Sequence, residues 1–167
     1  MEIEKSFDGF YKGKRVFLTG DTGFKGSWLA IWLLEMGAEV YGYALPPERK
    51  DDNYVVTKLN EKIHHLDGDI RDERSFKKFF KEAKPDIAIH LAAQPLVIDS
   101  YNDPKYTFET NIMGSVNFFE AVRETPSAKA AINVTTDKCY ENKEWVWGYR
   151  ENDPMGGFDP YSASKGC

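Results

Sequence analysis

The sequence lacks the features that would indicate a disulfide-stapled, zinc-bound or membrane-spanning protein. Its 167 residues include two cysteines, Cys139 and Cys167, with no C-x-x-C pair and no cluster of histidines. A disulfide framework or a metal site is therefore not predicted. The longest strongly apolar run, residues 28–34, is too short to cross a bilayer.

Excess positive charge is missing as well. The chain has 22 Lys and Arg against 27 Asp and Glu, a formal net charge of −5, so neither nucleic acid nor an anionic membrane is an expected partner. Residues 1–5 are charged and lack the apolar core of a signal peptide, which predicts a cytoplasmic protein. The length and the 41% of hydrophobic residues fit one soluble globular domain.

What the sequence does contain is a regular alternation of strand-like and helix-like segments. Apolar runs predict strands at residues 14–19, 39–44, 62–66, 86–92 and 129–135. Helical spacing predicts helices at 24–36, 72–83 and 106–123 and from about 160 onward, with loops at 48–60 and 139–159. Asp72 is a candidate helix cap and Gly37 a candidate positive-φ residue after a helix. This order predicts an α/β Rossmann fold, a doubly wound parallel sheet with ligands at the carboxyl ends of the strands.

Three glycines at a spacing of three, Gly20, Gly23 and Gly26, stand between the first predicted strand and the first helix. Glycine permits a tight turn, close approach of the backbone to a pyrophosphate and close packing of helix on strand. The helix N-terminus adds unpaired N–H groups that favour anions. We therefore predict that this turn, with Thr22, Phe24 and Lys25, binds the phosphates of NAD.

The end of the second predicted strand leaves the choice between NAD and NADP open. It ends in Tyr43-Ala44-Leu45, without the acidic residue that grips the adenosine ribose in many such folds. Arg49 and Lys50 follow and could meet a 2′-phosphate, although a solvated basic pair on a loop is the simpler interpretation.

A Tyr-x-x-x-Lys motif begins the last predicted helix. Tyr161 and Lys165 are four residues apart and share one helix face. A lysine ammonium there would stabilise tyrosinate and lower the tyrosine pKa from its usual value of about 10. Following a glycine motif and a strand that ends in Thr135 and Thr136, this motif predicts a catalytic base.

Taken together, these motifs resemble the extended short-chain dehydrogenases/reductases that act on nucleotide sugars, and among them the CDP-glucose 4,6-dehydratase family. The pair Asp137-Lys138 is the discriminating feature, because the resembling dTDP-glucose and GDP-mannose dehydratases carry a Glu-containing pair there. The stretches that carry the resemblance are residues 23–29, 42–45, 92–97, 136–140, 145–152 and 159–162. Many family members have His where this chain has Asp21, so a negative charge is expected near the phosphate turn.

The resemblance also implies further site residues. The predicted cofactor contacts are Asp69, Ile70, Leu91, Ala92, Ala93 and Thr135, together with Tyr161 and Lys165. The predicted substrate contacts are Gln94, Asn111 and Thr136. His90 is expected to be a packing residue, and Trp145 and Trp147 are expected to pack the long loop over the site.

The implied reaction is an internal redox cycle on a CDP-hexose. Thr136 would hydrogen-bond the 4-hydroxyl, and Tyr161 would take its proton while C4 gives a hydride to NAD⁺. Asp137, protonated through burial, would then release the 6-hydroxyl as water. Lys138 would remove the C5 proton, or would instead orient a water or stabilise an enolate. Return of the hydride to C6 and of a proton to C5 gives a 4-keto-6-deoxy sugar and regenerates NAD⁺.

Two alternatives stay open. In the first, the substrate is a different nucleotide sugar, which is dehydrated or epimerised. In the second, the chain is a dinucleotide-binding fragment without activity. The nucleotide-sugar domain that follows in this family is absent from the chain, so residues 1–167 are expected to form an incomplete NAD-binding domain with weak turnover at most. Homo-oligomerisation through the helix at 106–123 and the helix of Tyr161 and Lys165 is also expected from the resemblance.

Overall fold

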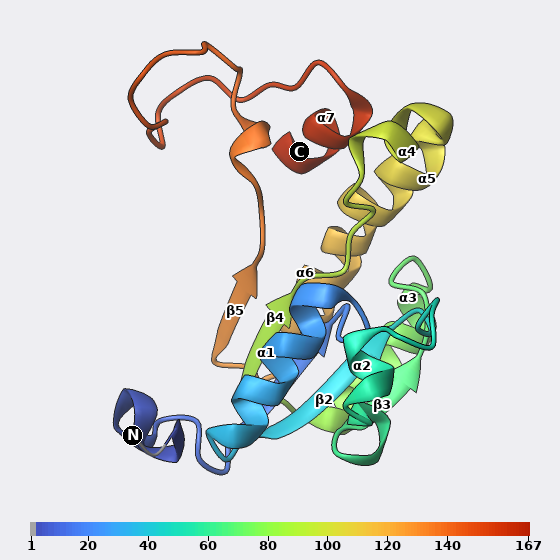
Figure 1. Ribbon diagram of the computed structural model, residues 1–167, viewed down its shortest axis with the longest axis vertical. Helices are drawn as coiled ribbons and strands as arrows, with labels where there is room; N and C mark the ends of the chain where they lie inside the picture. Colours follow the sequence, from blue (N-terminus) through green and yellow to red (C-terminus); the bar gives the residue numbers. More distant parts are fainter. Residues whose placement is uncertain (1–2) are drawn as a thin grey trace.

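The computed structural model describes residues 3–167 and contains one five-stranded sheet (Figure 1). The strands are β1 (Arg15–Thr19), β2 (Glu39–Ala44), β3 (His64–Asp67), β4 (Ile87–His90) and β5 (Ala130–Asn133). All neighbouring pairs are parallel, in the order β3-β2-β1-β4-β5. The strand order reverses between β1 and β4, so the predicted doubly wound parallel sheet is confirmed.

The helical segments alternate with these strands. The α-helices are α1 (Phe24–Glu35), α2 (Asn53–Val56), α3 (Glu73–Ala83), α4 (Val97–Asn102), α5 (Pro104–Phe108), α6 (Gly114–Arg123) and α7 (Pro160–Gly166). Short turns of other helical types are η1 (Ile3–Gly9), η2 (Leu59–Glu61), the π-helical η3 (Glu109–Met113) and η4 (Asp137–Cys139).

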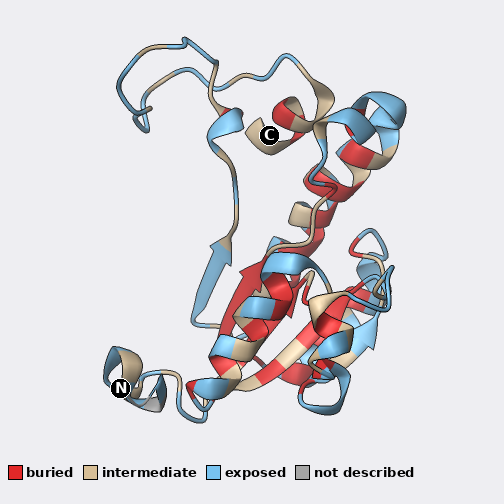
Figure 2. Ribbon diagram, in the orientation of Figure 1, coloured by how far each residue is buried: buried red, intermediate tan, exposed pale blue. Residues whose placement is uncertain are grey.

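Two apolar cores lie on the two faces of the sheet. Because side chains alternate along a strand, Val16 and Leu18 of β1 pack with α1 and α2, whereas Phe17 packs with α3 and α6. The buried stretch therefore runs through the centre of the sheet and the inner sides of its helices (Figure 2). At the sheet edge, Ala130, Ala131 and Ile132 of β5 are exposed.

Several local predictions are confirmed residue by residue. The Asp72 carboxylate accepts a hydrogen bond from Ser75 N and caps α3. Gly37 follows α1 with φ +80, the conformation that a non-glycine residue rarely adopts. Since both features depend only on neighbouring residues, the sequence was sufficient to place them.

The single helix predicted at residues 106–123 is wrong in detail. The structure has α5, η3 and α6 in one continuous run, and α5 begins at Pro104, where the Asp103 carboxylate accepts from Tyr106 N at 2.9 Å. The additional helix α4 was not predicted. Asp103-Pro104 is a strong helix-start signal for α5, whereas the apolar spacing on which the prediction rests begins only later.

Within residues 3–167, none of the helices combines the length and apolar character needed to cross a membrane.

The aromatic core on the α3 side provides a stability prediction. Phe80 is fully buried against Phe17, Phe76 and Phe118, so Phe80→Ala should lower the free energy of unfolding by about 3–5 kcal/mol. Phe119 on α6 is 46% exposed, and Phe119→Ala should cost less than about 1.5 kcal/mol. Urea unfolding of the two variants checks this. Equal losses would contradict the placement of the core.

Candidate active site

The glycine turn between β1 and α1 has the geometry of a phosphate cradle. Gly20 has φ +76, and a Cβ on Gly26 would lie 2.0 Å from the Gly20 carbonyl oxygen, so a side chain there would break the turn. The N-cap of the twelve-residue α1, Gly23, has no side chain to bond the first N–H groups. These N–H groups are consequently available to an anion.

This turn touches the end of β4 across the point where the strand order reverses. A Cβ on Gly20 would meet Ala92 N at 3.0 Å. The predicted contacts Leu91, Ala92 and Ala93 therefore lie beside the glycine turn. Thr22 is held by a hydrogen bond from its hydroxyl to Leu45 O at 2.8 Å, which ties the turn to the end of β2.

Asp21 lies beneath the turn rather than in a phosphate path. Its carboxylate is fully buried, contacts His65 Nδ1 at 2.7 Å, and leaves its Oδ1 without a hydrogen bond. His65 Nε2 contacts Asp67 at 3.0 Å. Burial alone would lower the pKa of His65, but its hydrogen bonds and attraction to Asp21 and Asp67 outweigh burial and raise the pKa.

The Asp69–Ile70 segment after β3 is fixed from two sides. The Asp69 carboxylate accepts from Arg71 N at 2.9 Å and from Arg71 Nη2 at 2.6 Å, and these bonds hold its pKa below the usual value. Ile70 O accepts from Asn117 Nδ2 at 2.9 Å. The predicted pair thus occupies a rigid segment at the carboxyl edge of the sheet.

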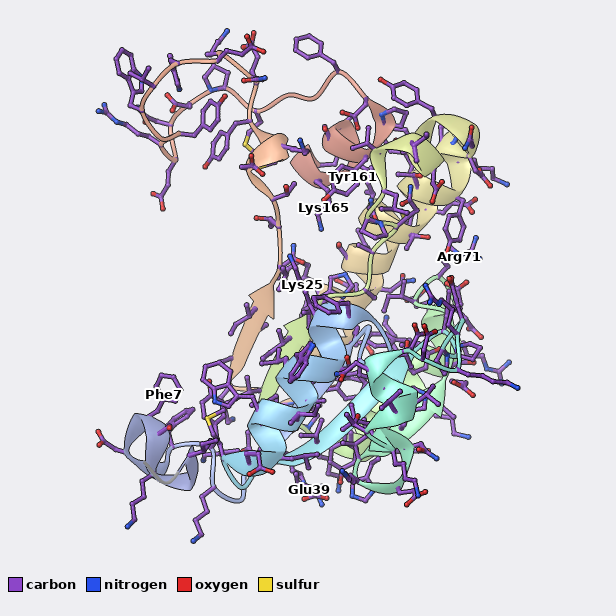
Figure 3. All side chains as sticks on the ribbon, viewed as in Figure 1. Phe7, Lys25, Glu39, Arg71, Tyr161 and Lys165 are labelled. Carbon is purple, nitrogen blue, oxygen red and sulfur yellow. The ribbon has the colours of Figure 1, made fainter. Side chains whose placement is uncertain are left out.

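The Tyr-Lys motif lies on α7, above the same edge of the sheet (Figure 3). Tyr161 is half-buried. The Lys165 ammonium donates to Val134 O, just after β5, at 3.0 Å, and burial lowers the pKa of this lysine. Lys165 therefore links α7 to the end of β5.

Asn111 and Gln94 form the support under α7. Asn111 Nδ2 donates to Ser164 Oγ at 2.8 Å and to Gln94 O at 3.1 Å, and its Oδ1 accepts from Gln94 N. All three side chains are buried. Gln94 and Asn111 were predicted to contact substrate. In the structure, the Asn111 side chain holds the Gln94 backbone and, through Ser164, the helix of Tyr161, whereas the Gln94 amide bonds Thr107 and the backbone of Leu96.

The second predicted catalytic group, Thr136, Asp137 and Lys138, forms η4 against α7. Thr136 Oγ1 donates to Asp137 Oδ1 at 3.1 Å. Asp137 and Lys138 line a cavity of about 240 Å³ together with Ser162 and Asp159. The expected burial of Asp137 is wrong, because its side chain is exposed. The loop at 141–159 that follows is itself largely exposed and leaves it uncovered.

A second cavity, of about 150 Å³, lies on the other side of α7. Its lining includes Lys165, Thr135 and Asn111. Both cavities border α7, and they separate Asp137 and Lys138 from Lys165, Thr135 and Asn111. Together they place hydroxyl, carboxyl and ammonium groups around one helix at the ligand-binding edge, which is the set needed for proton transfer next to a bound dinucleotide.

Three polar residues that hold the site were not predicted: the buried Ser164 and Asn117 and the half-buried Ser115. Each makes hydrogen bonds between elements. The available signal was a small polar residue at a core-facing helix position, which must find a partner when buried.

The chain is similar in sequence to known proteins. A family model described as GDP-mannose 4,6 dehydratase matches residues 17–167. The chain belongs to this family. Among curated members, the CDP-glucose 4,6-dehydratase of Salmonella typhimurium is 54% identical over 95% of this chain and 44% of its own length. A GDP-mannose 4,6-dehydratase of Vibrio cholerae is 34% identical over 91% of this chain and 43% of its own length.

Solved structures resemble the chain over a similar extent. The UDP-glucose 4-epimerase of Thermus thermophilus, a complex with NAD, is 31% identical with a TM-score of 0.77, covering 90% of this chain and 47% of that one. The UDP-glucose 4-epimerase of Thermotoga maritima, with UDP-glucose, has 27% identity and a TM-score of 0.80, covering 91% and 48%. The chain therefore spans about half the length of these four relatives.

The Asp21–His65–Asp67 contact predicts a pH dependence of stability. Because the pKa of His65 is raised in the folded state, its contribution is complete below the unfolded pKa of about 6.5 and is lost as pH rises through the folded pKa. Urea unfolding between pH 6 and pH 9 should show this loss in the parent chain.

His65→Gln should flatten this pH dependence, whereas His64→Gln, which removes a side chain 60% exposed on the same strand, should retain it. An unchanged slope in His65→Gln would contradict the assignment to His65.

Proposed function

We propose that the full-length protein is an NAD-dependent nucleotide-sugar 4,6-dehydratase that converts CDP-glucose to CDP-4-keto-6-deoxyglucose and water. The observation that carries the proposal is that Tyr161 and Lys165 lie on α7, and that η4 with Asp137 and Lys138 packs against this helix at the carboxyl edge of the sheet. The 54% identity to a curated CDP-glucose 4,6-dehydratase supports this substrate over other nucleotide sugars.

The residues present fit NAD. The cradle at Gly20 and Gly26, which a Cβ would fill, and the uncapped start of α1 suit a pyrophosphate. Arg49 is already paired with Asp51, which disfavours its use for a 2′-phosphate and so supports NAD over NADP. Two of the resembling solved structures, one of them 31% identical, are complexes with NAD. When bound, NAD⁺ supplies the reversible hydride acceptor.

In the first step of the reaction, the protein must remove the proton of the sugar 4-hydroxyl. Tyr161 takes it as the base, and Lys165 lies one helical turn further along α7 on the same face. Lys165 is held there by its bond to Val134 O. Thr136 would orient the 4-hydroxyl by a hydrogen bond.

Elimination of water follows because the 4-ketone acidifies the C5 hydrogen. Lys138 removes that proton, and Asp137 gives its proton to the departing 6-hydroxyl, so water leaves C6. Both side chains line one cavity. Return of the hydride to C6 and of the proton from Lys138 to C5 would then give the 4-keto-6-deoxy product. Since Asp137 is exposed in this chain, the proposal requires the rest of the protein or the substrate to cover it, which would favour its protonated form.

An epimerase of similar fold is the second candidate, supported by the 31% identical UDP-glucose 4-epimerase. It would use Tyr161 and Lys165 but has no need for an acid at Asp137. A cytoplasmic location and a homo-oligomeric state stay predictions.

The substrate assignment is tested by incubating the full-length protein with CDP-, dTDP-, GDP- and UDP-hexoses and NAD⁺, and by measuring the alkali-absorbing 4-keto product. We expect product from CDP-glucose and a loss of at least about a hundredfold in kcat for Tyr161→Phe. Tyr101→Phe, on the outer side of α4 with a 62% exposed ring, serves as the control. Product from none of the sugars would refute the dehydratase.

The role of Lys138 is tested by solvent-deuterium exchange at C5. Lys138→Met should abolish this exchange while NAD⁺ binding, followed by protein fluorescence, stays unchanged. The control is Lys143→Met, which removes a lysine paired with Glu141 in the loop that follows η4. Exchange at C5 should be normal in this variant. Normal exchange in Lys138→Met would assign the base elsewhere.

A further inference from the structure

A buried hydrogen-bond chain connects the glycine turn to the helix that carries Tyr161, and His90 is its central member. His90 is 2% exposed and stacks on Phe118 with ring centroids 4.8 Å apart. Its Nδ1 lies 2.7 Å from Thr19 Oγ1, and its Nε2 lies 3.2 Å from Ser115 Oγ. The ring therefore contacts β1 on one side and α6 on the other.

The directions of these hydrogen bonds follow from the partners. Thr19 Oγ1 accepts from Leu91 N at 3.1 Å and from Ala92 N at 3.0 Å. With both lone pairs used, its own hydrogen must be donated to His90 Nδ1. The imidazole proton is then on Nε2 and is donated to Ser115 Oγ, whose hydrogen goes to Asn111 O at 2.7 Å.

This arrangement accommodates neutral imidazole only. A second proton on Nδ1 would face a hydroxyl without a free lone pair. Burial, with a smaller effect from the charge of Lys165, lowers the pKa of His90 to about 4, so the ring stays neutral throughout the range in which enzymes of this kind work.

The two ends of the chain reach different halves of the site. On one side, Thr19 holds Leu91 and Ala92 against the glycine turn. On the other, Ser115 fixes the π-helical turn at Asn111, whose side chain bonds Ser164, and Ser164 Oγ donates to Tyr161 O at 2.7 Å. A π-helical turn inside a longer helix is common at functional sites.

We propose that His90 is a positioning residue that couples the dinucleotide half of the site, through Thr19, to the tyrosine half, through Ser115 and Asn111. This inference rests on the proposed function for its kinetic consequences. It goes beyond the prediction that His90 is a packing residue, because a packing role needs only the ring and not its two nitrogens.

Three substitutions separate the two nitrogens from the ring. His90→Asn places an amide oxygen near the position of Nδ1 and removes the bond to Ser115. We expect NAD⁺ affinity within about threefold of the parent and kcat lowered by at least about tenfold, the factor for one lost hydrogen bond.

His90→Gln does the reverse, because its amide nitrogen approaches the position of Nε2. We expect NAD⁺ affinity about tenfold weaker, measured by titration of the full-length protein. His90→Phe keeps the stacking and loses both bonds, so both affinity and kcat should fall. Phe118→Leu is the matched control, which weakens the stacking and stability but leaves affinity and kcat within about twofold.

The tautomer gives a readout that does not depend on NAD or on any substrate. Nitrogen-15 NMR of the histidine-labelled protein should show His90, identified by its absence in His90→Asn, as the Nε2-protonated neutral form down to about pH 4. A parent protein that has this tautomer but binds no NAD⁺ would defeat the proposed function and leave the hydrogen-bond chain standing.

Three results would overturn the coupling itself. They are an Nδ1-protonated tautomer, a His90→Phe variant with parental affinity and kcat, and identical defects in His90→Asn and His90→Gln.

Discussion

The close approach of three backbone segments at the centre of the sheet is the constraint on which the site depends. Gly26 packs so tightly on the Gly20 carbonyl, and Gly20 so closely on Ala92, that side chains at either glycine would force the segments apart. The approach places the start of α1 beside the end of β4. It also leaves the first N–H groups of α1 without side-chain partners, so the feature that shapes the site also makes it receptive to phosphate.

Buried hydrogen bonds stabilise the arrangement of segments that this close backbone contact sets up. Apolar packing alone holds helices on a sheet with little directional preference, whereas a buried hydrogen bond fixes one arrangement because leaving it unmade is costly. Thr19, His90 and Asn111 lie near the strand ends, and their hydrogen bonds reach the segment beside the glycine turn and the helix α7. Asp21 and His65 play the same part beneath the glycine turn.

The edge of the sheet and the Asp137 segment are less enclosed than the centre. β5 has exposed residues along its length, and Asp137 is exposed beside its cavity. The chain covers 44% of the curated CDP-glucose 4,6-dehydratase and 43% of the curated GDP-mannose 4,6-dehydratase described above. A protonated acid in the proposed dehydration needs a drier setting than this, so the proposed chemistry depends on what covers η4, whereas dinucleotide binding depends on the turn described above.

The sequence by itself determined the strand and helix alternation, the parallel doubly wound sheet, the glycine turn, the Asp72 cap and the Tyr-Lys motif. All of these follow from local spacing or from the handedness of βαβ units. Only the tertiary structure decided that the run from Pro104 contains a π-helical turn, that Gln94 and Asn111 support α7, and that Asp21 is buried on His65. These depend on which polar groups from distant segments meet in the interior, and hydrophobic periodicity carries no information about such pairs.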